Sequence, residues 1–306
     1  MKIFDLHCDT LSLINKNHRL IENTGHVDIK RMMRADYLCQ CFAVFTDETD
    51  ADTAFFYLKK QYMLFLGEMQ KHRFFISPAR CSEEILENCR QGLLSAVLTV
   101  ENGSFIGEDL SRLKVAKSMG VKMITLLWNN ENCLGYPHTK DKARMLYGLK
   151  PTGKRAVEIM NGLDIIIDVS HLNYGGFWDV IKLSKKPVVA SHSCCNALFH
   201  HTRNLTDEQL RAVGNGGGVI GVNFYARFIK DEPNATLIDD VIAQIKHIQN
   251  VAGTDAVALG SDFDGMNSFL EFCDCTGMPK IADTLLGQFG VEITEKICYK
   301  NALRIF

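Results

Sequence analysis

The feature that most constrains the fold is an alternation of short apolar runs with amphipathic segments along all 306 residues. Eight of the runs are apolar on both faces, as strands of a parallel sheet covered by helices should be. These runs lie at residues 3–7, 38–45, 93–100, 121–127, 165–169, 187–190, 219–224 and 256–260. Segments that predict helices lie between them, for example at residues 51–70, 109–119, 152–160, 206–213 and 237–251.

Eight strands that alternate with helices predict an α/β fold of the TIM-type (β/α)8 barrel. The sequence has no Pro/Gly linker, internal repeat or low-complexity tract, so we expect one barrel domain over residues 1–306. The extended stretch RFFIS at residues 73–77 is interpreted as a connection outside the barrel. The alternative architecture is an open, doubly wound sheet.

Composition restricts the partners and the compartment. The net charge is −2, from 34 basic and 36 acidic residues that are interspersed, so we expect neither nucleic acid nor a membrane as a partner. The longest uncharged apolar runs, such as LLSAVLTV, are too short to cross a bilayer. Eleven cysteines, without a signal-peptide pattern after Met1, predict reduced thiols and a cytoplasmic location.

Ionisable residues follow most of the apolar runs at their carboxyl ends. They are His7 and Asp9 after the first run, Glu101 after the third, His171 after the fifth, His192 after the sixth, and Asp262 and Asp264 after the eighth. The carboxyl ends of barrel strands open on one face, and residues two apart on a strand project the same way. Any one of these residues alone is more often an ordinary loop residue. Together they would cluster charge at a cost in free energy, unless a metal or a substrate compensates.

Imidazole and carboxylate groups suit Zn²⁺ or a similar first-row metal. Two metals need a shared carboxylate, and a single Glu between two pairs of other ligands fits that role. Other motifs give no competing site. GGGVIG at residues 216–221 precedes a strand, whereas a dinucleotide-binding loop follows one, and FCDCTG and SCC lack the second pair of a structural zinc site. The pattern therefore predicts a metal centre on one rim of the barrel.

Longer motifs carry a family resemblance. They are FDLHCDT, TVENG, GLKPTGKRAVEIMN, IIIDVSHL, ASHSCCNALFHHTRNL, GVNFY, GSDFDG and the terminal NALRIF. In this order, from residue 4 to residue 306, they resemble the membrane (renal-type) dipeptidase family, peptidase family M19 of the amidohydrolase superfamily. The SH block followed by TRNL and the GSDFDG segment are the most specific.

The resemblance implies a zinc-dependent dipeptidase with a metal-dependent-hydrolase barrel as its single catalytic domain. Such an enzyme cleaves the peptide bond of free dipeptides with a hydroxide that bridges two zinc ions. By this resemblance His7, Asp9 and Glu101 would hold one Zn²⁺, and Glu101, His171 and His192 would hold the second, with Glu101 as the bridge.

The same resemblance assigns roles around the metals. Asp262 would be the catalytic acid/base and Asp264 a structural residue. Arg203 would receive the free carboxylate of the substrate, and Tyr225 would line the substrate pocket. Trp128 stands where the familiar animal enzymes carry a His that helps to bind the tetrahedral oxygen, and an indole can donate a hydrogen bond but carries no charge. We expect Trp128 to contact the substrate and to alter its selection.

The animal enzymes also carry a signal peptide and a lipid anchor, and this sequence shows neither pattern, which favours a cytosolic member of microbial style. A small dipeptide is the expected partner, and a homodimer is left open. The alternative function is another binuclear metal amidohydrolase, such as a deacylase of N-acyl amino acids. A non-catalytic barrel would have a broken ligand set, and here the set is complete.

Overall fold

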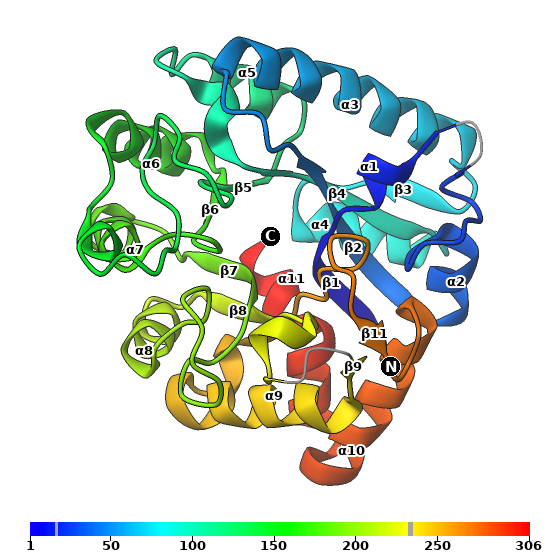
Figure 1. Ribbon diagram of the computed structural model, residues 1–306. Helices are drawn as coiled ribbons and strands as arrows, with labels where there is room; N and C mark the ends of the chain where they lie inside the picture. The colour runs from blue at the N-terminus through cyan, green and yellow to red at the C-terminus, as the bar shows by residue number, and fades with distance from the viewer. Residues whose placement is uncertain (16–17, 232–234) are drawn as a thin grey trace.

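The apolar runs form a closed barrel of parallel strands, seen in Figure 1 in a computed structural model that describes residues 1–15, 18–231 and 235–306. Each strand pairs with its neighbours in the order β2-β1-β10-β8-β7-β6-β5-β4, and β4 pairs back to β2. The strands are β1 (Ile3–Cys8), β2 (Tyr37–Phe45), β4 (Leu94–Glu101), β5 (Met123–Thr125), β6 (Ile166–Asp168), β7 (Val189–Ser193), β8 (Val219–Val222) and β10 (Val257–Leu259). The TIM-type barrel is confirmed, and the alternative of an open sheet is wrong because the ring closes.

In the described part of the chain, three further strands lie outside this ring. There β3 (Ile76–Pro78) pairs only with β4, in agreement with the expectation that the RFFIS stretch lies outside the barrel. β9 (Ala235–Thr236) and β11 (Phe269–Leu270) form a two-stranded parallel pair of their own.

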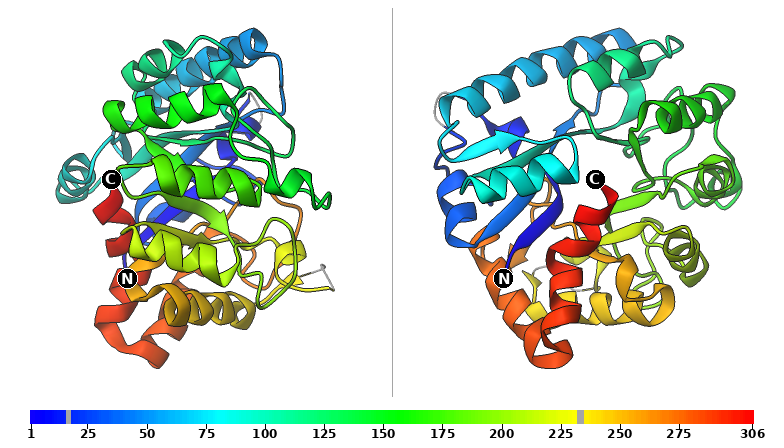
Figure 2. Two further views of the ribbon diagram at one scale, coloured as in Figure 1. Left: turned by 90° about the vertical axis from the view of Figure 1, so that its left-hand side faces the viewer. Right: turned by 180° about the vertical axis from the view of Figure 1, so that it is seen from behind.

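Helices surround the barrel, as the side and rear views show (Figure 2). They are α1 (Thr10–Leu13), α2 (Ile29–Arg34), α3 (Ala51–Lys71), α4 (Ser82–Arg90), α5 (Arg112–Ser118), α6 (Pro151–Leu163), α7 (Tyr174–Leu183), α8 (Asp207–Asn215), α9 (Ile238–Ala252), α10 (Met278–Glu295) and α11 (Asn301–Ile305). Local sequence signals explain several boundaries. Thr206 caps α8 in a reciprocal capping box with Gln209, and Pro151 stands in the first turn of α6.

Several apolar runs are longer than the strands they contain. The run at residues 121–127 contains β5, and Leu126 and Leu127 are fully buried just beyond its end. An apolar run indicates which residues are buried, whereas the bounds of a strand depend on hydrogen bonding to the neighbouring strands. The sequence therefore predicts the position of each strand better than it predicts the first and last residues of the strand.

The two ends of the barrel differ in chemistry. At the amino end, the ring of Phe4 lies 5.1 Å from that of Phe306, so the residue after α11 helps to close this end with apolar packing. Inside the barrel, β7, β8 and β10 approach one another very closely. A Cβ atom on Gly221 would lie 2.1 Å from the carbonyl oxygen of Ser191, and one on Gly260 would lie 1.8 Å from the same atom. Only glycine fits at either position.

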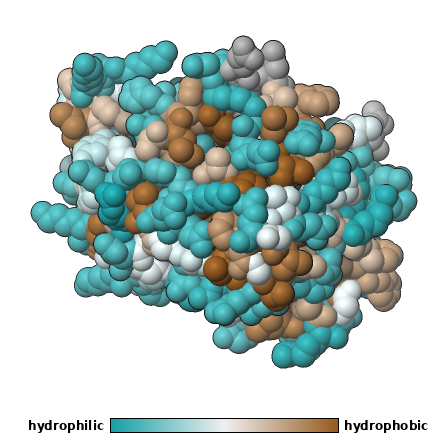
Figure 3. Space-filling model, turned by 90° about the horizontal axis from the view of Figure 1, so that it is seen from below, coloured by the Kyte–Doolittle hydropathy of each residue, from teal (hydrophilic) through white to brown (hydrophobic). Residues whose placement is uncertain are grey.

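The outer surface mixes hydrophilic and hydrophobic residues, and Figure 3 shows this on the face seen from below. Exposed apolar side chains include Phe269 and Val291. Within the described ranges, no helix combines the length and the apolar character that a membrane crossing requires.

Candidate metal centre

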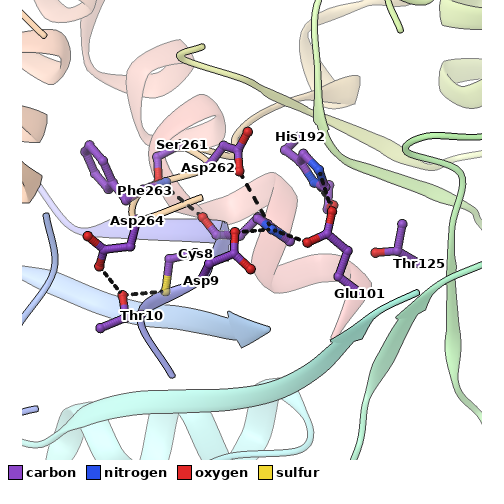
Figure 4. A network of polar contacts seen from close by, with 12 residues as sticks. Cys8, Asp9, Thr10, Glu101, Thr125, His192, Ser261, Asp262, Phe263 and Asp264 are labelled. Atoms are coloured by element: carbon purple, nitrogen blue, oxygen red, sulfur yellow. Dashed lines mark hydrogen bonds and ion pairs between the residues drawn. The ribbon is translucent and has the colours of Figure 1, made fainter. Parts of the chain in front are cut away.

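The carboxyl ends of the strands bring five predicted residues into one buried cluster. These are His7, Asp9, Glu101, His171 and His192, each no more than 7% exposed. Figure 4 shows Asp9, Glu101 and His192 pointing toward one another, with Asp262 beside them. The spacing argument for the first strand holds, because His7 Nε2 and Asp9 Oδ2 are 3.3 Å apart.

Glu101 occupies the middle of the cluster and presents one oxygen to each side. Its Oε2 lies 3.5 Å from His7 Nε2, whereas its Oε1 lies 3.0 Å from His171 Nε2 and 3.5 Å from His192 Nε2. Two sets of ligand atoms that could hold a cation therefore share this residue: His7, Asp9 and Glu101 on one side, and Glu101, His171 and His192 on the other. A third set of suitable atoms joins His7, His192 and Asp262.

Hydrogen bonds fix the orientation of two imidazoles. Ser191 Oγ donates to Asp168 Oδ2 at 2.5 Å, so it accepts from His192 Nδ1 at 2.6 Å. Asn129 Oδ1 accepts from His171 Nδ1 at 3.1 Å. Both histidines then carry their proton on Nδ1 and turn the lone pair of Nε2 toward Glu101. Partners of this kind typically orient histidines that bind metals.

A second polar clamp joins β1 to the loop after β10. The backbone N–H of Ser261 donates to Asp5 Oδ1 at 2.8 Å and its hydroxyl donates to Asp5 Oδ2 at 2.6 Å. Asp262 follows directly, and its Oδ2 accepts from Asn223 Nδ2 at 2.9 Å. The other oxygen, Oδ1, lies 4.0 Å from His7 Nε2. The clamp therefore leaves one oxygen of Asp262 facing the cluster.

Burial sets the ionisation of the cluster. Burial raises the pKa of Asp262 to about 7 and that of Asp9 to about 6; the carboxylate of Glu101 adds to both shifts, and His7 opposes them. Burial disfavours a charged His7, yet Asp9 and Glu101 raise its pKa well above the usual range. Burial, with Arg203 nearby, lowers the pKa of His171 to about 4.

The donor set fits bound metal ions. Asp9 Oδ1 is buried and has no hydrogen-bond partner within the described segments, which is costly unless a cation meets it. Neutral imidazoles with free Nε2 lone pairs and closely spaced carboxylates are the ligands that zinc and similar first-row metals take. These residues are therefore suited to hold metal ions.

The backbone is strained around the cluster. Asn102, His171, Asp262 and Asp264 all have φ between 64° and 83°, in the region that favours glycine. Such conformations cost about 1–3 kcal/mol each for other residues and concentrate at functional sites.

The side chain of Asp264 takes part in a contact between two segments of the rim, since its Oδ2 accepts a hydrogen bond from Thr10 Oγ1 at 2.6 Å. This contact joins the start of α1 to the loop after β10 (Figure 4).

A cavity of about 390 Å³ opens above the cluster. Its polar lining includes Asp9, Glu101, His171 and Asp262. Its apolar lining consists largely of four aromatic side chains, Phe45, Trp128, Tyr225 and Phe228. Tyr225 and Trp128 thus both line this cavity.

Arg203 lies behind the wall of this cavity. It is 3% exposed and does not belong to the lining residues; its guanidinium carbon is 5.7 Å from the ring of Phe228, which does. Its Nη1 donates to Ser193 Oγ at 2.9 Å and its Nη2 to the carbonyl oxygen of His192 at 2.8 Å. Its Nε is buried without a hydrogen-bond partner among the described residues. Arg203 makes no direct ion pair there, although the carboxylates of Asp168, Asp262 and Glu101 lie near enough to favour its charge.

Sequence reasoning missed the residues that support the cluster. Asp5 and Asp168 lie on the apolar runs, and each receives hydrogen bonds from a serine next to a site residue. A buried carboxylate inside an apolar run was the available signal. Asn129, Asn223 and Phe45 had no comparable signal, because their roles depend on which loops meet at the rim.

An α/β barrel with buried His, Asp and Glu gathered at the carboxyl ends of its strands defines a metal-dependent hydrolase of the amidohydrolase type. The family model described as membrane dipeptidase (peptidase family M19) matches residues 1–306, so the chain belongs to this family. It is accordingly a metallo-dipeptidase, a hydrolase that acts on peptide bonds.

Two relatives match most of this chain. The uncharacterized protein in the pqqA 5' region of Klebsiella pneumoniae is 35% identical over 232 residues, which cover 72% of this chain and 84% of the relative. Dipeptidase tcpJ of Claviceps purpurea is 27% identical over 292 residues, which cover 92% of this chain and 68% of the relative.

Two solved structures have the same fold over the whole chain. The dipeptidase AC, a metallopeptidase of family M19, has a TM-score of 0.92 and 27% identity, and the match covers 100% of this chain and 97% of that one. A metallopeptidase from Rhodobacter sphaeroides, liganded with a phosphinate mimic of the dipeptide L-Ala-D-Ala, has a TM-score of 0.92 and 26% identity, with 100% and 98% covered.

Proposed function

We propose that the protein is a zinc-dependent dipeptidase that hydrolyses the peptide bond of free dipeptides, with two zinc ions per chain. The observation that carries the proposal is the position of Glu101. Its Oε2 faces the imidazole of His7, and its Oε1 faces the imidazoles of His171 and His192. His7 and Asp9 complete one ligand set with Glu101, and His171 and His192 complete the other. A bridging carboxylate of this kind is what a two-metal hydrolytic site requires.

Zinc ions held there would polarise the scissile carbonyl and acidify the attacking water. The remaining steps belong to Asp262, which takes a proton from that water on Oδ1 and delivers it to the leaving amine. Asn223 holds Oδ2 and so keeps Oδ1 toward the reacting atoms. A buried carboxyl whose pKa is raised to about 7 can both accept and return a proton near neutral pH.

Arg203 is proposed to receive the free carboxylate of the dipeptide, with Tyr225 and Trp128 as lining residues. Its buried Nε, which has no hydrogen-bond partner among the described residues, supports this role. A guanidinium binds a carboxylate through two parallel hydrogen bonds, and such charge-assisted bonds are about twice as strong as neutral ones. The dipeptide mimic bound by the Rhodobacter sphaeroides relative supports the same class of substrate.

The test is a panel of substrates offered to the zinc-loaded enzyme. Free dipeptides, with L,L and L,D pairs included, should be cleaved, and their C-terminal amides should be cleaved at least about 30-fold less efficiently in kcat/KM, since the amide leaves Arg203 unpaired. Arg203→Ala should remove most of this difference by impairing the free dipeptide, and Arg203→Lys should retain part of it.

Two outcomes would contradict the proposal. Equal kcat/KM for a dipeptide and its amide would mean that Arg203 does not bind the free carboxylate of the substrate. Faster hydrolysis of N-acyl amino acids than of dipeptides would favour the deacylase alternative, because both reactions use the same metal ligands.

The cytoplasmic location and the lack of membrane and nucleic-acid partners stay predictions, and whether the protein forms a homodimer stays open. Cell fractionation tests the location, and light scattering of the purified protein tests the assembly.

A further inference from the structure

Two pairs of aromatic side chains line the cavity above the metal centre. Phe45 and Trp128 form one pair, with ring centroids 4.9 Å apart in an edge-to-face arrangement. Tyr225 and Phe228 form the other, also 4.9 Å apart and edge-to-face. Each pair is half-buried and presents an apolar surface to the cavity.

The barrel places these pairs on opposite sides of the metal centre. Phe45 ends β2 and Trp128 follows β5, and these two strands flank β4, which ends in Glu101. Tyr225 and Phe228 follow β8. In the ring β1-β2-β4-β5-β6-β7-β8-β10, strand β8 is four steps from β4 in either direction. A substrate centred on the metals would therefore extend one end toward each aromatic pair.

The position of Arg203 determines the orientation in which a dipeptide would bind. Its guanidinium lies behind Phe228, on the same side as Tyr225. A substrate carboxylate directed to Arg203 places the second residue of the dipeptide beside Tyr225 and Phe228. The side chain of the first residue then lies on the opposite side, against Phe45 and Trp128.

We propose that Phe45 and Trp128 form the surface that selects the first residue of the dipeptide, and that they favour a bulky apolar side chain there. This inference rests on the proposed dipeptidase function. An apolar side chain gains from burial against two rings. An acidic first residue would meet Asp9, Asp262 and Asp264 in the same cavity, where the described lining contains no Lys or Arg to pair with it.

The experiment compares kcat/KM for Phe-Ala, Leu-Ala, Gly-Ala, Asp-Ala and the reversed dipeptide Ala-Phe on the zinc-loaded enzyme. We expect Phe-Ala and Leu-Ala to exceed Gly-Ala by about tenfold or more, with Asp-Ala poorest, since apolar contacts of this size are worth 10- to 200-fold. Trp128→Ala and Phe45→Ala should each lower kcat/KM for Phe-Ala at least about threefold more than kcat/KM for Gly-Ala, so that the ratio of the two falls.

Matched variants separate selection from general damage. Trp128→Phe keeps an aromatic ring and should keep the preference for Phe-Ala over Gly-Ala. Tyr225→Ala should impair Ala-Phe more than Phe-Ala, because it alters the opposite pair. Equal losses on all five dipeptides in Trp128→Ala would overturn the inference, because the residue would then act on catalysis or folding and not on selection.

The failure of the inference is distinct from the failure of the proposed function. If the zinc-loaded enzyme cleaves no dipeptide, the dipeptidase proposal is wrong and the selection surface falls with it. If it cleaves dipeptides but treats Phe-Ala, Gly-Ala and Asp-Ala alike, only the selection surface is wrong. This panel on the unaltered enzyme decides the matter even where Trp128→Ala does not fold.

Discussion

The two ends of the barrel treat aspartate side chains in opposite ways. At the amino end, Asp164 lies 2.8 Å from the ammonium of Lys122 and 2.5 Å from that of Lys186, and these hydrogen bonds hold its pKa well below the usual range. At the carboxyl end, burial raises the pKa of Asp262 to about 7 and of Asp9 to about 6. The ionised form of an aspartate is thus stabilised at the amino end and destabilised at the carboxyl end.

This contrast indicates which end of the barrel needs a counter-charge that the chain does not supply. The lysines around Asp164 neutralise it from within the protein. The carboxylates around Glu101 are not matched by enough cations, so an added cation is the natural counter-charge. The amino end therefore serves stability, and the carboxyl end serves chemistry.

The largest effect should come from Glu101→Gln, because this change removes the one carboxylate shared by both ligand sets. We expect the unaltered protein to hold about two zinc equivalents after reconstitution and Glu101→Gln to lose both, with kcat/KM below roughly 10⁻⁴ of the original. Elemental analysis and a dipeptidase assay measure this. Asp164→Asn, at the other end, is the matched control and should keep both zinc and activity. No more than one tight zinc in the unaltered protein would contradict the two-metal centre.

The next effect concerns the proton-transfer role of Asp262. Asp262→Asn keeps the size of the side chain but cannot take up the proton, so turnover should fall roughly 10²- to 10⁴-fold while zinc content stays near normal. Steady-state kinetics and elemental analysis on the same preparation test this. An activity within about threefold of the original would assign Asp262 another role.

A third prediction concerns stability without metal. The pKa of Asp262 is raised to about 7 in the folded chain from 3.8, so its contribution to stability is present below pH 3.8 and is lost as the pH rises through 7. At pH 8, Asp262→Asn should therefore stabilise the metal-free protein by on the order of 1–3 kcal/mol. Urea unfolding in the presence of a chelator measures this, and the gain should shrink at pH 4. A loss of stability at pH 8 would refute the comparison.

The smallest effect is the reverse change at the amino end. The pKa of Asp164 is lowered, so its contribution to stability is fully present above pH 3.8, declines below that value and is lost only as the pH falls through the lowered pKa of the folded chain. Asp164→Asn should destabilise the protein by about 0.5–1.5 kcal/mol at pH 7, mainly because buried Lys122 loses its partner; the figure is small because Asp164 is itself half-exposed. Asparagine tolerates the left-handed backbone there. Urea unfolding at pH 7 and pH 3 should show a smaller difference at pH 3 than at pH 7.

Much of the candidate metal centre could be predicted from short segments of the sequence. A polar residue directly after an apolar run lies on the rim of a parallel barrel, whatever the details of packing. His7, Glu101 and His192 needed only this rule, and the family motifs then separated them from chance.

The rest depends on contacts between distant loops. Nothing in the sequence states that Arg203 lies behind Phe228, or that Asn129 orients His171 from a loop 42 residues earlier in the chain. The pairing of Phe45 with Trp128 likewise arises only when β2 and β5 flank the same strand. Such relations follow from the closed ring and not from any short segment.

The close approach of Gly221 and Gly260 to the carbonyl oxygen of Ser191 affects how sequences of related proteins should be interpreted. A single added methyl group at Gly260 would press on the residue directly before His192 and displace an imidazole that faces Glu101. Such a variant could lose function with every polar residue of the centre intact. When a related gene is judged active or decayed, these two glycines therefore carry as much information as the histidines.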